Sequence, residues 1–331
     1  MKKNIYIFNS GVLKRKDNSL VLRNEHETKF IPIEETATIW VFGEIEFNKR
    51  VLEFLSIKNI VVHLYNHYGF YMSSIYPREF YNSGFVLLKQ CEYYTNNELR
   101  LNIAKEILKA SFKSMEQNLV YYRNRKDPSL SSSIEIISSL RKSMDSVESI
   151  SELMGIEGNG RVEYYSAFNK ILQNDDFKFL GRSKQPPKDA INALISFGNS
   201  LTYNLVLSEI YHTHLNPTIG YLHSTNQRSF TLNLDIAELF KPIIVDKVIF
   251  TLINKRIISI DDFDSDFNST LLSERGRRKF LKEFDEKINT TIKYNKIHKN
   301  VSYKRLIRLQ VYKLQKHILE NDKLEFYWSK W

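Results

Sequence analysis

Residues 217–246 read PTIGYLHSTNQRSFTLNLDIAELFKPIIVD. A turn delivers one histidine, His223, and the polar stretch 224–229 separates it from an apolar run. That run carries Asp235 and Glu238, three residues apart, and this spacing puts both acids on one face of a helix. An imidazole nitrogen and carboxylate oxygens together form a ligand set for a divalent cation such as Mn²⁺ or Mg²⁺.

The same stretch also has a purely structural interpretation. A histidine before an amphipathic helix is commonly a hydrogen-bonded side chain, and an aspartate at a helix entry is favoured by the helix dipole alone. Short motifs match by chance often enough that spacing does not decide between the two interpretations. No thiol lies nearby, which argues against a structural zinc site.

The segment GYLH, followed by SFTLNLDIAELFKPIIVD, resembles the signature of the CRISPR-associated integrase-endonucleases that insert new spacers, the Cas-one family. The counterparts here are His223, Asp235, Glu238 and the segment 240–242. The resemblance runs over nearly the full chain. It implies a metal-dependent DNA endonuclease and strand transferase of prokaryotic antiviral defence, in which a 3′-hydroxyl attacks a phosphodiester of the CRISPR array.

A second stretch, residues 153–172, reads LMGIEGNGRVEYYSAFNKIL and has polar and aromatic residues at helical spacing on one face: Glu157, Arg161, Tyr164 and Phe168. Spacing alone favours a purely structural interpretation, in which Glu157 and Arg161 form a surface ion pair that lies on top of a stripe of aromatic core residues. However, IEG-x-x-R-x-x-Y-Y resembles the first metal-ligand motif of the family, in which the glutamate before glycine is the ligand. The chain departs from that pattern where the family often has alanines, at Gly160 and Arg161.

The resemblance therefore implies one site assembled from distant segments. Glu157, His223 and Glu238 are the expected catalytic metal ligands, with Asp235 as a reserve ligand, and the cation is Mg²⁺ or Mn²⁺. Three strong ligands predict a single bound metal rather than two.

The composition is that of a soluble globular protein: 331 residues, 42% hydrophobic and 26% charged. The apolar runs are far shorter than the ~20 residues that cross a bilayer, and the N-terminus is a poor signal peptide. Cys91 is the only cysteine, which excludes an intrachain disulfide and fits a cytoplasmic protein.

The positive charge is concentrated near the C-terminus. The net charge is +10, and residues 271–331 contain 16 Lys and Arg against 7 Asp and Glu, whereas the other 270 residues contain 32 against 31. This distribution indicates an anionic partner such as nucleic acid. A solvated basic helix face without a ligand is the alternative.

The sequence predicts an α+β fold with two domains. Short β-branched and aromatic runs with Gly and Asn turns predict an N-terminal antiparallel β-sandwich or roll over residues 1–90, with one short helix near 48–58. His63 and His67 in this domain are interpreted as structural. A linker is expected at 91–97, with a capping box at 95–98. Helical periodicity then predicts an all-α catalytic and DNA-binding domain over 98–331 that carries the metal site.

DNA contacts are expected from basic residues near helix starts and along the basic C-terminal segment. The loop 181–193 feeds a helix in whose first turn Pro187 is expected, and a solvated basic loop is the alternative there. The residues predicted to contact DNA are Arg161, Tyr164, Arg182, Lys184, Lys188, Lys241, Arg275, Arg277 and Arg278.

The resemblance also implies partners: double-stranded DNA as spacer fragment and CRISPR repeat, a second copy of the chain in a homodimer, and the small partner Cas-two, with the β-domain serving dimerisation and docking. No membrane is expected. Two other function classes stay open from the residues themselves, a non-catalytic nucleic-acid scaffold and a metallo-phosphoesterase that acts on small substrates. The basic C-terminal segment argues against the second of these.

Overall fold

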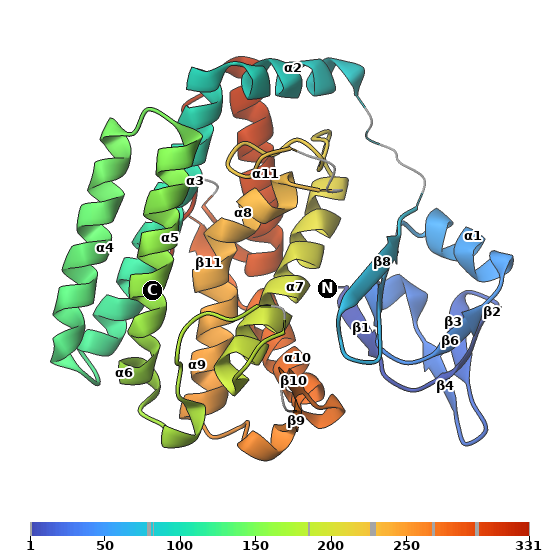
Figure 1. Ribbon diagram of the computed structural model, residues 1–331. Coiled ribbons are helices and arrows are strands. Elements are labelled where there is room, and N and C mark those ends of the chain that lie inside the picture. The colour runs from blue at the N-terminus through green and yellow to red at the C-terminus, as the bar shows by residue number, and fades with distance from the viewer. Residues whose placement is uncertain are drawn as a thin grey trace. The chain divides into compact units, whose positions relative to one another are not determined.

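The computed structural model describes residues 2–77, 81, 83–184, 186–225, 230–266, 269–294 and 298–330, the side chains at 265 and 266 excepted. It divides into two compact units at positions 80 and 81 (Figure 1). The predicted boundary at 90 is therefore too late. The chain is already helical from Gly84 onward, and that helix belongs to the second unit.

The first unit contains two four-stranded sheets. One has the order β1 (Lys3–Ile7), β5 (Thr36–Val41), β7 (Val61–Tyr65) and β8 (Tyr71–Ile75). The other has the order β4 (Thr28–Ile31), β3 (Ser19–Arg23), β2 (Gly11–Lys16) and β6 (Ile45–Phe47).

The two sheets are mixed, so the prediction of an antiparallel sandwich is wrong in this respect. Strands β1 and β7 run parallel to β5, and β6 runs parallel to β2. Parallel neighbours need a crossover rather than a tight turn. Helix α1 (Lys49–Ile57) lies between β5 and β7 in the sequence, and the strands of the second sheet lie between β1 and β5.

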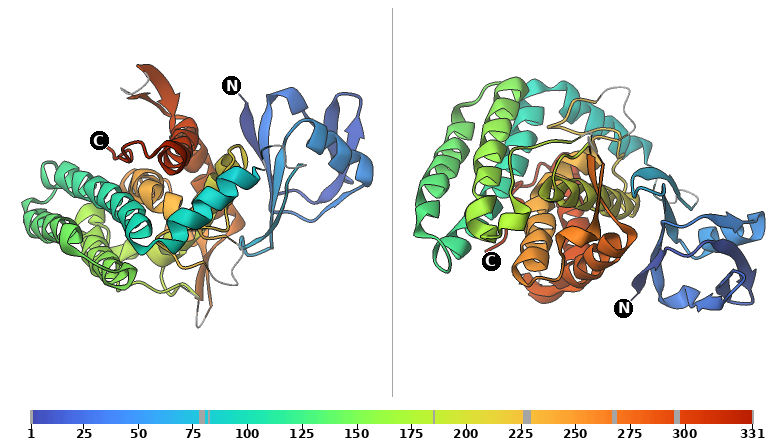
Figure 2. Two further views of the ribbon diagram at one scale, coloured as in Figure 1. Left: turned by 90° about the horizontal axis from the view of Figure 1, so that it is seen from above. Right: turned by 60° about the horizontal axis from the view of Figure 1, so that its bottom comes forward.

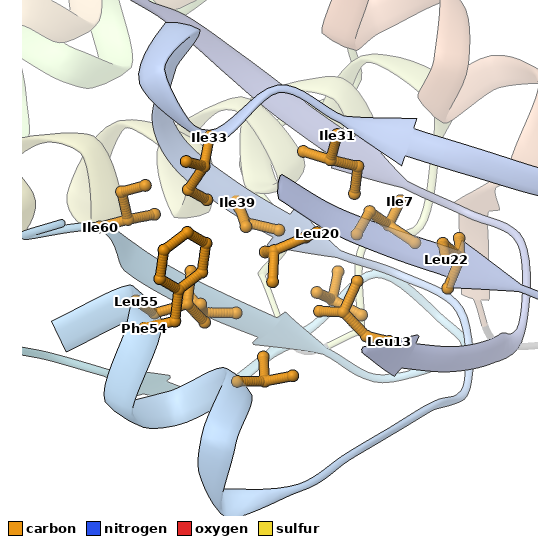
Figure 3. Packing of buried hydrophobic residues seen from close by; sticks show 13 residues of the cluster. Ile7, Leu13, Leu20, Leu22, Ile31, Ile33, Ile39, Phe54, Leu55 and Ile60 are labelled. Carbon is orange, nitrogen blue, oxygen red and sulfur yellow. The ribbon is translucent and has the colours of Figure 1, made fainter. Parts of the chain in front are cut away.

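The core of this unit lies between the sheets and α1. Figure 3 shows aliphatic side chains from both sheets pointing toward one another, with Phe54 and Leu55 of α1 beside them. The helix predicted near 48–58 is confirmed, and the side chain of Asn48 caps it by accepting from the backbone N–H of Val51. His63 is fully buried, and its Nδ1 lies 2.6 Å from the Ser74 hydroxyl, as its structural interpretation predicts.

The second unit is mainly helical. Its α-helices are α2 (Gly84–Thr95), α3 (Asn97–Arg123), α4 (Ser131–Ser143), α5 (Ile150–Ser166), α6 (Phe168–Leu172), α7 (Ala190–Tyr211), α8 (Leu232–Phe240), α9 (Asp246–Asn254), α10 (Glu274–Asn289) and α11 (Tyr303–Glu320). Short 3₁₀ turns occur at Pro128–Leu130, Met144–Ser146, Asp175–Phe177 and Ile260–Asp262.

Three predictions for this unit are wrong. It is not all-α, because β9 (Phe263–Asp266) pairs with β10 (Ser269–Leu272) and β11 (Thr291–Tyr294) with β12 (Lys299–Ser302). The expected linker 91–97 is the end of α2 and the start of α3, with Asn96 rather than Thr95 as the cap of α3. Pro187 precedes its helix, because α7 begins at Ala190 under an Asp189 cap.

The centre of the second unit is one nearly continuous helical rod, α8–η5–α9, where η5 is a π-helix at Lys241–Val245. Figures 1 and 2 show this rod between the layer formed by α3, α4 and α5 and the helices α7, α10 and α11. Every residue from Ile236 to Ile249 is buried, which explains why the sequence here is apolar on all sides. The two acids on α8 therefore lie in the interior rather than on an outer face.

Pro242 explains the change of helical type. Proline has no N–H, so the carbonyl of Glu238, four residues earlier, loses its usual helical donor. The hydroxyl of Ser111 on α3 donates to that carbonyl at 2.8 Å instead. The carbonyl of Pro242 accepts from the Asn118 amide at 2.8 Å. Two polar side chains of α3 therefore attach it to the rod at the level of Glu238.

Among the described residues, no helix is long and apolar enough to cross a membrane.

Candidate metal and nucleic-acid site

A tight loop presents His223 to the interior. The carboxylate of Asp235 accepts the backbone N–H groups of Tyr221, Leu222 and His223. A Cβ at Gly220 would lie 2.9 Å from Asp235 Oδ2, so only glycine lets the loop approach the carboxylate this closely. Within the polar stretch 224–229, positions 226–229 lie outside the described residues.

Asp235 also fixes the imidazole. Nδ1 of His223 lies 2.8 Å from Asp235 Oδ1. Since a carboxylate accepts, Nδ1 carries the hydrogen and Nε2 keeps its lone pair, the arrangement that supporting carboxylates give metal-binding histidines. The side chain of Asp235 is fully buried and its two oxygens already accept four hydrogen bonds. The structure thus gives the predicted reserve ligand a positioning role behind His223.

The guanidinium of Arg161 brings the two predicted glutamate ligands together. Its Nε donates to Glu157 Oε1 at 3.1 Å, and its Nη2 donates to Glu238 Oε2. Nε and Nη2 form one edge of the planar fork. One oxygen from α5 and one from α8 therefore lie side by side, although the two residues are far apart in the sequence.

Lys241 binds the other oxygen of Glu238, Oε1. Burial alone raises the pKa of the Glu238 carboxyl, but Lys241 and Arg161 outweigh it and lower that pKa to about 2. Burial likewise opposes the charge of Lys241, yet Glu238 raises its pKa above the usual value. Glu238 is therefore an ionised carboxylate held between two cations.

His223 lies within the electrostatic reach of this cluster. Burial lowers its pKa, but the hydrogen bond to Asp235, the charge of Asp235 and the charge of Glu238 together raise it. In this arrangement, the part of the chain that the structure describes has no group of three His, Cys, Asp or Glu residues close enough to hold a metal ion. The basic side chains of Arg161 and Lys241 occupy the carboxylate oxygens instead.

The donor set nevertheless fits a hard divalent cation. Two carboxylate oxygens lie on one guanidinium edge, and an imidazole is oriented by a buried aspartate. Carboxylate oxygen and imidazole nitrogen are ligands that Mn²⁺ accepts, and carboxylates suit Mg²⁺. The cluster already brings cationic groups into contact with these oxygens.

A further buried acid near the cluster, Asp246, was not among the residues predicted from the sequence. Asp246, the first residue of α9, is 1% exposed, and burial raises the pKa of its carboxyl to about 7. The hydroxyl of Tyr164 is hydrogen-bonded to Asp246 and accepts from the Asn118 amide at 2.8 Å. The available signal was the position of this aspartate at the end of the motif KPIIVD.

Several predicted DNA contacts have other roles. Tyr164 is fully buried, so its prediction as a DNA contact is wrong. Arg277 is 7% exposed and donates to the Leu272 carbonyl, so it is a structural residue here. Arg161 and Lys241 bind Glu238, as described above.

The other predicted contacts lie nearer to solvent. Lys184, Lys188, Arg275 and Arg278 are exposed. The last two also form ion pairs, Arg275 with Asp262 at 2.6 Å and Arg278 with Glu274 at 2.7 Å.

Arg182 is half-buried. Its guanidinium donates to Asn192 Oδ1 at 2.7 Å and to the Ser196 hydroxyl at 3.2 Å. This attaches the basic loop to the first turns of α7, and the exposed pair Lys184 and Lys188 is therefore presented by an anchored loop.

Comparison with known proteins identifies the family. The family model for CRISPR associated protein Cas1 matches residues 5–286. The CRISPR-associated endonuclease Cas1 2 of Thermodesulfovibrio yellowstonii is 47% identical over the full length of both chains. A solved Cas1 protein from Thermotoga maritima is 43% identical, with a TM-score of 0.86 over 99% of this chain and 100% of that chain.

The fold extends to a more distant solved structure. A casposase bound to an integration product is 22% identical, with a TM-score of 0.86 over 98% of this chain and 93% of that chain. At this identity the likeness shows the shared fold. Because the family model spans most of the chain and a relative at 47% identity covers all of it, the chain belongs to the Cas1 family of CRISPR-associated proteins.

Proposed function

We propose that this chain is a metal-dependent DNA endonuclease and strand transferase that inserts spacer DNA into a CRISPR array, as part of cytoplasmic antiviral defence. The observation that carries the proposal is the bridging of Glu157 and Glu238 by one guanidinium edge, beside an imidazole fixed by Asp235. The close relative named an endonuclease supports the nuclease class.

In this proposal Glu157, Glu238 and Nε2 of His223 hold one Mg²⁺ or Mn²⁺. When bound there, the cation supplies Lewis-acid polarisation of the scissile phosphate. The chain's own residues do the rest. Asp235 keeps the hydrogen on Nδ1, so that Nε2 keeps the lone pair that a metal would use. Lys241 is bonded to Glu238, and its ammonium would stabilise negative charge on a phosphate oxygen held there.

The nucleophile decides the outcome at a single site. Attack by water on a phosphodiester breaks its P–O3′ bond and cleaves DNA. Attack by the 3′-hydroxyl of a bound fragment forms a new P–O bond to the target strand and breaks the target's P–O3′ bond, so that the target's own 3′-hydroxyl leaves. The partners in this proposal are duplex DNA, a second copy of the chain, and the small partner Cas-two of the family resemblance. Lys184 and Lys188 are exposed on the anchored loop and are the first candidates for phosphate contacts.

The test combines the protein, the Cas-two partner, Mn²⁺ and a labelled fragment with a supercoiled plasmid that carries the repeat. We expect covalent transfer of the label into nicked plasmid. Glu157→Gln and Glu238→Gln lower this activity by ~100-fold or more, while fragment binding measured by fluorescence anisotropy is retained. Glu163→Gln is the matched control, because Glu163 lies on α5 like Glu157 but is not one of the proposed ligands.

Two results would overturn the proposal. If Glu238→Gln leaves the transfer of label unchanged, another component of the mixture carries out the reaction, and this chain is a non-catalytic scaffold. DNA affinity that does not fall with salt would favour an enzyme acting on small phosphoesters, because contacts to DNA phosphates release counterions.

A further inference from the structure

Buried side-chain atoms without a hydrogen-bond partner among the described residues include Nη1 of Arg161, Oδ2 of Asp246 and Oδ1 of Asn118, whose amide donates to Tyr164. Nη1 of Arg161 is a donor and Oδ2 of Asp246 an acceptor, and they belong to groups of opposite charge. Buried polar atoms in folded proteins are nearly always satisfied, because an unpaired one costs free energy. The unpaired donor of Arg161 and the unpaired acceptor of Asp246 therefore complement each other.

Arg161 is engaged elsewhere in the structure. Its Nε and Nη2 bridge Glu157 and Glu238, which gives two neighbouring carboxylates the positive charge that they need in the interior. A divalent cation bound by the same oxygens supplies that charge itself. The guanidinium would then repel the cation and keep donor hydrogens on the ligand oxygens, so it has to leave.

Asp246 is, beside Glu238 and Glu157, the acid whose charge raises the pKa of Arg161. The charges of Arg161 and Asp246 act on each other. Arg161 lies three residues before Tyr164 on α5, and Tyr164 is hydrogen-bonded to Asp246, so the arginine and the aspartate lie on the same side of α5.

We propose that Arg161 has two positions, bridging Glu157 and Glu238 when no metal is bound and pairing with Asp246 when a divalent cation is bound. Arg161 is then an internal competitor of the metal, and Asp246 sets how strongly it competes. This inference rests on the proposed metal site. It adds that metal binding and the exchange of an ion pair are one event.

The proposal makes opposite predictions for two substitutions. Arg161→Met removes the competitor, so the Mn²⁺ dissociation constant falls by about tenfold or more, and the metal-free protein melts at a lower temperature because the two carboxylates are left facing each other. Asp246→Asn removes the destination, so the dissociation constant rises by about tenfold. In the Arg161→Met background, Asp246→Asn has no further effect, because no guanidinium remains to be received.

Mn²⁺ binding is measured by titration calorimetry and by the electron paramagnetic resonance signal of free Mn²⁺. The proteins compared are the wild type, the two single variants and the double variant, and melting curves of each are recorded with and without Mn²⁺.

The matched control is Arg141→Met. Arg141 Nε lies 2.7 Å from Glu116 Oε1 in a half-buried helix–helix ion pair that involves none of the site residues. This control lowers the melting temperature and leaves Mn²⁺ affinity unchanged. If Arg161→Met does not fold, Arg161→Lys, which keeps the charge but loses the two-pronged fork, replaces it with the same expected direction.

The outcomes separate this inference from the proposed function. Wild-type protein that binds no Mn²⁺ overturns the metal site and the inference with it. Wild-type protein that binds Mn²⁺, together with an Arg161→Met variant of equal or weaker affinity, overturns the two-position arginine alone. Equal effects of Asp246→Asn in the presence and absence of Arg161 overturn it as well, since the two residues would then act independently.

Discussion

The carboxylate of Asp235 accepts both the Nδ1 hydrogen of His223 and the backbone N–H of the same residue, at 2.8 and 3.0 Å. One side chain thus fixes the ring and the loop that carries it. Asp235→Asn keeps an acceptor oxygen but replaces the other oxygen by a donor, which conflicts with the N–H groups that it faces. We expect Mn²⁺ affinity to fall by roughly 10–100-fold, measured by calorimetry. Asp127→Asn, at the cap of a distant 3₁₀ turn, is the control and leaves affinity unchanged.

The pH dependence of stability follows from His223. Its pKa is raised, because Asp235 and Glu238 outweigh the effect of burial. A group whose pKa is higher in the folded state adds stability that is fully present below its ordinary value of 6.5 and is lost as the pH rises through the raised pKa. We expect the free energy of unfolding of the metal-free wild type, from urea melts in EDTA, to fall through this window relative to His223→Gln. Parallel pH profiles of the two proteins would show that the imidazole is not coupled to the acids.

Metal affinity has the opposite pH dependence. Protons compete with a metal for Nε2, and a raised pKa extends that competition toward neutral pH. We expect the Mn²⁺ dissociation constant of the wild type to decrease as pH rises through the pKa of His223. The pKa itself is measured from the ring resonances of His223 by NMR. An affinity independent of pH over this window would count against His223 as a ligand.

Gly160 lies where α5 packs closely against α3. A Cβ at Gly160 would lie 2.2 Å from Cζ of Phe112. Gly160→Ala therefore overpacks the interface between α3 and α5, and we expect a loss of about 1–3 kcal/mol in the free energy of unfolding. The control is Gly155→Ala on the same helix, where nothing lies within 4 Å. That substitution stabilises the protein by about 0.5–1 kcal/mol. Phe112→Leu restores part of the loss in the Gly160→Ala background.

Ser111 and Pro242 form a compensating pair around the carbonyl of Glu238. Ser111→Ala leaves that buried carbonyl without its donor, and we expect a cost of about 1–3 kcal/mol in chemical denaturation. In a Pro242→Ala background the restored backbone N–H supplies a donor, so Ser111→Ala becomes less costly. Equal costs in both backgrounds would show that the serine acts through some other contact.

Much of the chain's secondary structure was readable from the sequence, including the helices that carry the candidate ligands. The helix that carries Asp235 and Glu238 and the helix that carries Glu157 are present, because helical spacing of apolar residues is a local signal. Spacing did not reveal that Asp235 supports His223 whereas Glu238 binds Arg161. Asp235 turns toward the loop through Gly220 and His223, whereas Glu238 turns toward α5, and only the packed rod separates the two directions.

The remaining errors share a physical cause. Strand direction in the first unit depends on which distant strands pair, and the short runs of the sequence do not encode that pairing. Tyr164 and Arg277 were interpreted as DNA contacts from residue type, but both are buried by neighbours far away in the sequence. Arg161 is the most informative case, because its position was suspected of contacting DNA and its guanidinium instead binds two acids from different helices.

The serine that replaces the donor missing at Pro242 comes from a helix 127 residues away from the carbonyl it serves. This contact makes two remote parts of the gene inseparable. A chimera that keeps this central rod but takes α3 from a chain without the serine leaves the carbonyl of Glu238 buried without a donor. The rod and α3 therefore have to be exchanged together wherever the serine differs.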